Sequence, residues 1–96
     1  MELLVAYDID TSDRAGQRRL GKVAKICESY GVRVQYSVFE CSISLAARES
    51  LLGKLREVIK DDVDSVFVYA FPGQLNTART TLGRRAGPVA SGTWIV

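Results

Sequence analysis

The stretch LLVAYD, at residues 3–8, is a compact apolar run that stops at an aspartate. Such a run predicts a buried strand in the interior of a sheet. The polar residues that follow at positions 10–13 (Asp, Thr, Ser, Asp) are typical of turns and helix starts. We therefore expect a central first strand that ends at Asp8 and a turn that leads into a helix.

Two helices are expected from the spacing of apolar residues. The first begins between residues 14 and 17 and ends at Tyr30, and Gly31 just past its end is free to take the positive φ that favours a helix stop. The second covers residues 45–60 and is ended by the aspartates that follow it. The apolar stripe of the first helix consists of Leu20, Val23, Ala24 and Cys27, and that of the second of Leu51, Leu52, Leu55, Val58 and Ile59.

Three further strands are expected from β-branched and aromatic residues. Residues 32–44 are long enough for a hairpin, with its turn near residues 35–37, and residues 65–71 form a fourth strand before Pro72-Gly73. The order β-α-β-β-α-β predicts an α+β, ferredoxin-like fold. Two helices would then cover one face of a four-stranded antiparallel sheet of order 4-1-3-2, with the first strand in its interior.

The end of the chain differs in composition from the expected ferredoxin-like domain at residues 1–73. Residues 74–92 hold no acidic residue and three arginines, and predict an extended basic segment. Thr93–Val96 favours a strand. Pairing with the sheet edge of a second subunit would cover that edge and join two chains. Pairing within its own subunit is the alternative. The three arginines are Arg79, Arg84 and Arg85.

Composition limits the cellular setting and the chemistry. The 96 residues suffice for one domain, and the net charge of +2 does not by itself indicate a polyanion as partner. No apolar run approaches the roughly 20 residues that span a membrane, and no basic leader precedes the first strand, so we expect a cytoplasmic protein. Without histidine, Ser-His-Asp and Cys-His catalysis and His-based zinc sites are excluded. The isolated Cys27 and Cys41 are expected to be reduced, buried thiols.

Asp8 is the first candidate for chemistry, because a carboxylate at a strand end projects from the end of the sheet. Mg²⁺ binds oxygen ligands and often keeps several waters beside one or two carboxylates. Two Asp8 side chains that meet across a two-fold axis would make such a site, in which the metal activates water and offsets charge on phosphorus. The alternative is that Asp8 caps the next turn. Asp10 and Asp13 are either further ligands or turn and N-cap residues.

Basic residues on the first helix are candidates for phosphate contacts. Arg18, Lys22 and Lys25 lie at i, i+4 and i+7, opposite the apolar stripe, and Arg14 and Arg19 are close by. A solvated helix face shows the same pattern, so both interpretations stay open. Arg33 lies inside a strand-like segment, where its charge needs a phosphate or a carboxylate of another subunit. Tyr7, Tyr36 and Phe39 are interpreted as core or interface residues.

Four motifs together resemble a known family: YDI at residues 7–9, RLGKVAK at 19–25, YGVRVQYSVFEC at 30–41 and DSV at 64–66. Over residues 1–71 the chain is similar to the small CRISPR-associated adaptation protein, the non-integrase member of the pair that captures new spacers. The length and the Asp-Thr-Ser loop resemble the branch that accompanies subtype I-C systems.

The resemblance implies a ferredoxin-like homodimer in which each C-terminal strand joins the other subunit's sheet. It also implies that the dimer bridges two integrase dimers along duplex DNA, and that some members cleave double-stranded DNA or single-stranded RNA with Mg²⁺ or Mn²⁺. The family's strand-end aspartate falls on Asp8, its tyrosine on Tyr7, its strand arginine on Arg33 and its phenylalanine on Phe39.

Three functions are compatible with these expectations. The first is a metal-dependent phosphodiesterase that uses Asp8, with Arg33 and the basic residues of the first helix holding the nucleic acid. The second is an adaptor that binds duplex DNA and the integrase without catalysis. The third is a small-molecule regulatory module, since a ferredoxin-like fold does not determine function.

Overall fold

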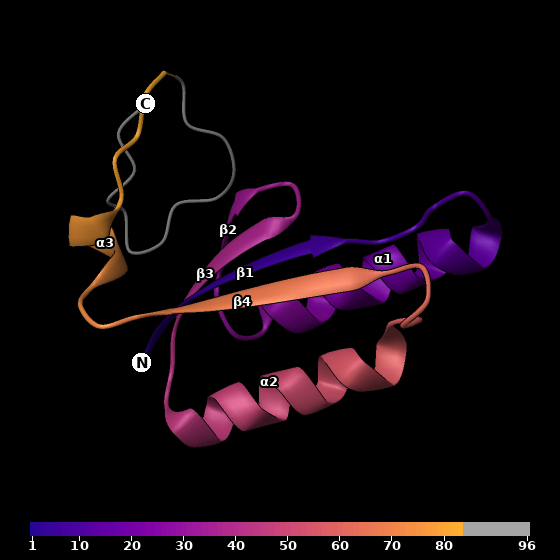
Figure 1. The fold of residues 1–96 in the computed structure, drawn as a ribbon, viewed down its shortest axis with the longest axis horizontal. Coiled ribbons are helices and arrows are strands. Elements are labelled where there is room, and N and C mark those ends of the chain that lie inside the picture. Colours follow the sequence, from indigo (N-terminus) through magenta and orange to yellow (C-terminus); the bar gives the residue numbers. More distant parts are fainter. Residues whose placement is uncertain (84–96) are drawn as a thin grey trace.

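The computed structural model describes residues 1–83 of the chain, and within them the expected βαββαβ order is confirmed. The sheet is antiparallel and has the strand order β2-β3-β1-β4, which places the first strand in its interior (Figure 1). The elements are β1 (Glu2–Asp8), α1 (Arg14–Glu28), β2 (Val32–Gln35), β3 (Val38–Ser42), α2 (Leu45–Val58), β4 (Ser65–Phe71) and α3 (Leu75–Ala78).

Strand β1 determines the arrangement of the sheet because it pairs with β3 on one side and with β4 on the other. Its side chains alternate between the two faces. Leu3, Val5 and Tyr7 are buried on the face that carries α1 and α2. Burial of such apolar side chains contributes about 1.5–3 kcal/mol each. The alternate residues of β1, from Glu2 to Asp8, therefore lie on the opposite face.

Helices α1 and α2 pack on the buried face through Val23, Cys27, Leu51 and Leu55. The expected stripe of α1 is wrong at Leu20, which is 37% exposed. The inward position of that turn is taken instead by Arg19, whose side chain is only 17% exposed. Both thiols are free and buried, as expected, and burial raises the pKa of Cys27 to about 12. None of the helices in residues 1–83 is long and apolar enough to cross a membrane.

Gly31 follows α1 for a different reason from the expected one. Within residues 1–83 the only glycine with a positive φ is Gly83, so the expected left-handed conformation at Gly31 is wrong. A Cβ on Gly31 would overlap the carbonyl oxygen of Glu40 and the sulfur of Cys41. Glycine is therefore required because the end of α1 passes close to the backbone of β3.

The other face of the sheet carries exposed aromatic residues of β4. Phe67 is 60% exposed and Tyr69 is 54% exposed, while Val66 and Val68 pack toward the helices. In register, Phe67 lies opposite Ala6 and Tyr69 lies opposite Leu4 of β1. We call this side of the sheet, with Leu4, Ala6, Asp8, Phe67 and Tyr69, the open face.

The segment after β4 folds back against the end of the sheet where the chain begins (Figure 1). Leu75 is buried, and its N–H donates to Glu2 Oε1 over 3.1 Å. Arg79 Nε donates to Glu40 Oε2 over 2.8 Å. The expected extended conformation is therefore wrong for residues 75–78, which these contacts hold as a short helix. Arg84, Arg85 and the strand expected at Thr93–Val96 lie outside the described residues.

Candidate functional site

Asp8 ends β1 as the sequence predicts, opposite Ser65 of β4. Its side chain is exposed and lies on the open face, on the same side as Ala6 and Phe67. Within residues 1–83 its carboxylate accepts no hydrogen bond and forms no ion pair with another side chain. Both oxygens of Asp8 are therefore available to a ligand from outside this part of the chain.

The turn after β1 is capped by other aspartates. Asp10 Oδ1 accepts the Ser12 N–H over 2.9 Å, and this hydrogen bond lowers the pKa of Asp10. Asp13 is the N-cap of α1 and accepts the Gly16 N–H over 2.8 Å. The interpretation of Asp10 and Asp13 as turn and N-cap residues is confirmed, and the alternative turn-capping role for Asp8 is not observed.

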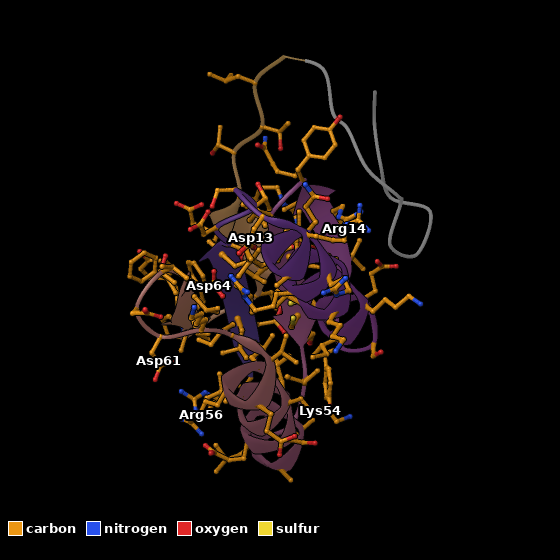
Figure 2. All side chains as sticks on the ribbon, turned by 90° about the vertical axis from the view of Figure 1, so that its right-hand side faces the viewer. Asp13, Arg14, Lys54, Arg56, Asp61 and Asp64 are labelled. Atoms are coloured by element: carbon orange, nitrogen blue, oxygen red, sulfur yellow. The ribbon has the colours of Figure 1, made fainter. Side chains whose placement is uncertain are left out.

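A buried ion pair joins α1 to the segment before β4. Arg19 Nε donates to Asp64 Oδ2 over 2.8 Å, and the Asp64 side chain has no exposed surface. The same carboxylate accepts the N–H of Asp10 over 2.9 Å and the N–H of Lys60 over 2.8 Å. Arg19 is the main cause that lowers the pKa of Asp64 to about 2, against the raising effect of burial. Figure 2 shows Asp64 toward the middle of this end of the molecule, while Asp61 and Arg56 lie at its outline.

Sequence reasoning missed this pair. Asp64 was expected only to help end α2, and Arg19 was considered as either a phosphate contact or part of a solvated helix face. Its two members are 45 residues apart, so no local periodicity connects them. The one available signal is that Arg19 occupies a position from which α1 faces the core, where a charge needs a partner.

The basic residues of α1 divide into two groups. Arg19 points inward and pairs with Asp64, so it is not among the exposed residues that could contact phosphate. Arg14, Arg18, Lys22 and Lys25 are exposed, and their spacing places them along one side of α1. We call these four residues the basic row. In the described part of the chain none of them forms a salt bridge. Figure 2 shows Arg14 at the outline of the molecule.

Tyr7, Phe39 and Arg33 cluster on the opposite face of the sheet from Asp8. The rings of Tyr7 and Phe39 are stacked at 6.2 Å between centroids, and the Arg33 guanidinium carbon lies 5.1 Å from the Phe39 centroid. Tyr7 donates its hydroxyl to the carbonyl of Tyr36 over 3.3 Å, and burial raises its pKa. Tyr36 itself is 93% exposed, so it is not a core residue of the single chain, and its interpretation as an interface residue stays a prediction. Consecutive strand residues point to opposite faces, so Tyr7 does not share a ligand site with Asp8.

Arg33 retains one unsatisfied donor in this cluster. Its Nε is buried and has no hydrogen-bond partner among the described residues. Arg33 points to the helix side of the sheet, and strand β3 lies between its strand β2 and the strand β1 that carries Asp8. The structure thus does not bring Arg33 to the Asp8 carboxylate, with which it was expected to share a substrate.

A single chain offers few ligands for a metal ion. Among residues 1–83 no group of three or more histidine, cysteine, aspartate or glutamate side chains is arranged to hold a metal. One exposed carboxylate does fit the way Mg²⁺ is bound, since this ion often takes one or two carboxylates and keeps several waters. The second carboxylate would have to come from another molecule.

The fold and these residues define a class: a small ferredoxin-like domain with an exposed carboxylate at the end of its central strand and, on its first helix, a basic row that forms no salt bridge within residues 1–83. The family model described as CRISPR associated protein Cas2 matches residues 1–77. The chain belongs to the Cas2 family.

Relatives and solved structures agree with this membership. The chain is 45% identical over 69 residues, 72% of either protein, to "CRISPR-associated endoribonuclease Cas2 1" of Moorella thermoacetica. It is 39% identical over 85 residues, 88% of either protein, to "CRISPR-associated endonuclease Cas2" of Halalkalibacterium halodurans. The crystal structure of Streptococcus pyogenes Cas2 superposes with a TM-score of 0.79 at 41% identity, covering 86% of this chain and 100% of that one.

Proposed function

We propose that this protein is a metal-dependent endonuclease that acts as a homodimer in CRISPR adaptation. Its substrate would be double-stranded DNA, with single-stranded RNA as the alternative. The names endonuclease and endoribonuclease of its relatives support phosphodiester hydrolysis. The observation that carries the proposal is the position of Asp8, exposed on the open face with no partner among residues 1–83.

The proposed homodimer uses the open face. Leu4 and Ala6 of β1, beside the exposed rings of Phe67 and Tyr69, supply an apolar surface that a second copy would remove from water. In an interface with two-fold symmetry the same residues meet from both subunits. Asp8 borders this surface, so two Asp8 carboxylates can meet across the axis. The expected strand at Thr93–Val96 would strengthen the dimer by joining the partner's sheet.

Mg²⁺, or Mn²⁺ in its place, would be held by the two Asp8 carboxylates. When bound, such an ion lowers the pKa of water and offsets negative charge on the phosphate. Arg14, Arg18 and Lys22 would contact phosphates along the nucleic acid and hold it beside the two-fold axis. Tyr7, Phe39 and Arg33 would support β1 from the helix side instead of contacting the substrate.

The adaptor is the second candidate, and the single carboxylate that each chain contributes favours it. If the two Asp8 side chains do not meet, no metal site forms, whereas the basic row still binds duplex DNA. In both functions we propose the CRISPR integrase as partner. We also propose that the chain is of the subtype I-C-like branch, on its length and its Asp-Thr-Ser loop.

Asp8→Asn tests the endonuclease, with Asp62→Asn as a matched control because Asp62 is also exposed and loses the same charge. We expect Asp8→Asn to lose at least about a hundredfold in cleavage of duplex DNA or single-stranded RNA, since a bound cation supplies several kcal/mol. Asp62→Asn should cleave like the parent. Equal cleavage by Asp8→Asn and the parent contradicts the mechanism. Spacer acquisition that survives Asp8→Asn selects the adaptor.

A further inference from the structure

We infer that the Arg19–Asp64 ion pair is a positioning device for Asp8: it fixes the backbone immediately after β1 and thereby the direction of the metal-binding carboxylate. The inference rests on the proposed function, because it assigns the pair a role in metal binding. Arg19 and Asp64 touch neither metal nor substrate in this scheme, and they act only through Asp8.

The pair holds both peptide groups of Asp10, two residues beyond Asp8. The Asp10 N–H donates to Asp64 Oδ1 over 2.9 Å. The Asp10 carbonyl accepts from Arg19 Nη2 over 3.4 Å. Only Ile9 separates Asp8 from this clamped residue, and Ile9 is itself buried. The chain therefore has little freedom to turn between the end of the strand and the clamp.

Asp64 also acts on Asp8 from the neighbouring strand. The residue after it, Ser65, is the first of β4 and lies opposite Asp8 in the sheet. The Asp64 carboxylate is held in turn by the N–H of Lys60 over 2.8 Å. The carboxylate thus joins the turn after β1, the helix α1 and the segment before β4 at one buried point. Asp8 is held from two sides: along its own chain by the turn after β1, and across the sheet by Ser65, the residue next to Asp64.

Close packing at the start of α1 removes the remaining freedom of the turn. A Cβ on Gly16 would overlap the carbonyl oxygen of Asp10. The helix backbone therefore lies directly against the residue that the ion pair clamps. Asp13 holds the N–H of Gly16 over 2.8 Å and keeps the helix start in place. The turn from Asp8 to Asp13 is fixed by contacts on several sides, whereas the Asp8 carboxylate at its start has no partner among residues 1–83.

A positioning role for this ion pair makes a prediction that a simple loop anchor does not make. Groups that orient a metal ligand commonly change metal affinity by 10- to 100-fold when they are removed, without themselves touching the ion. A metal ion shared across a two-fold axis needs an accurately placed carboxylate from each subunit, so mobility of the turn would disturb both of its ligands. A merely structural ion pair would lower stability and leave metal affinity unchanged.

The test is Mn²⁺ binding to the intact protein, measured without nucleic acid by the electron paramagnetic resonance of free Mn²⁺. We expect Asp64→Asn and Arg19→Lys to weaken Mn²⁺ binding by about tenfold or more. Asp62→Asn, an exposed aspartate of the same segment, should bind Mn²⁺ like the parent. Melting curves define a temperature at which every variant is folded. If Asp64→Asn does not fold, Arg19→Lys, which keeps the charge, decides the question.

Two results contradict the inference in different ways. If Asp8→Asn binds less Mn²⁺ than the parent but Asp64→Asn and Arg19→Lys bind as the parent does, the positioning role is wrong and the proposed function stands. If the parent binds no Mn²⁺, or Asp8→Asn binds as much as the parent, the proposed metal site is wrong and the positioning role is overturned with it.

Discussion

Replacement of Asp64 by asparagine should lower the stability of this small domain by an amount that depends on pH. Arg19 and two backbone N–H groups lower the pKa of Asp64 from 3.8 to about 2. A depressed pKa of this size corresponds to roughly 2 kcal/mol of stability at neutral pH, because the folded state favours the charged carboxylate. Asparagine keeps an oxygen that can accept a hydrogen bond, but it loses the stabilisation that comes from the negative charge of the carboxylate.

The direction of the pH effect follows from the sign of the shift. Since the folded-state pKa lies below the unfolded value, the stabilisation is fully present above about pH 5 and is lost as the pH falls toward 2. At pH 2.5 about a third of it should remain. The difference in free energy of unfolding between the parent and Asp64→Asn should therefore be largest at neutral pH and should become smaller in acid.

Thermal unfolding followed by circular dichroism at a series of pH values measures this stability difference as a difference in melting temperature. A loss of roughly 2 kcal/mol should lower the melting temperature by about 10 °C at pH 7 in a domain of this size. Protein concentration must be held constant, because a dimer's melting temperature depends on it. Asp62→Asn controls for the charge change. A difference in melting temperature between the parent and Asp64→Asn of less than about 2 °C at pH 7, or one that stays constant down to pH 2.5, would refute the reasoning.

Three other predictions use different parts of the structure. Gly53→Ala should raise stability by about 0.5–1 kcal/mol in thermal melts, because Gly53 lies within α2 and a Cβ there meets no atom within 4 Å. Cys27 and Cys41 should resist iodoacetamide at pH 8 until the protein is denatured, because burial raises the pKa of these thiols to about 12 and about 11; rapid labelling of the native protein would contradict their burial. Arg18→Glu with Lys22→Glu should weaken duplex DNA binding in a filter-binding assay. It should also make the slope of log affinity against log salt less steep by about 1.8, as each of the two lost phosphate contacts contributes about 0.9. An unchanged slope would remove the basic row from the interface.

The sequence predicts the framework well where the pattern is local. The run at residues 3–8 indicates a central strand, and the structure places it between β3 and β4. The hairpin turn expected near residues 35–37 falls between the end of β2 at Gln35 and the start of β3 at Val38. Asp13 has the residue type and position of an N-cap, and it caps α1. Each of these features depends on neighbours in the chain.

The features that the sequence does not predict depend on residues far apart in the chain. Arg19 fits a basic helix face equally well until Asp64 is placed beside it. Gly31 fits a helix stop, but it is required by the backbone at Glu40. Leu75 lies in a segment of extended character, but it is buried and its N–H donates to Glu2 of β1. In each instance a tertiary contact decides the conformation.

The central claim is that two Asp8 carboxylates of a homodimer share one divalent cation. Anomalous diffraction from crystals of the full chain grown with MnCl₂ tests it most directly. We predict one Mn²⁺ for every two chains, on the two-fold axis and bound by Asp8 from both subunits. A dimer whose two Asp8 side chains lie on separate surfaces, or a well-ordered dimer with Mn²⁺ bound elsewhere, would contradict the account.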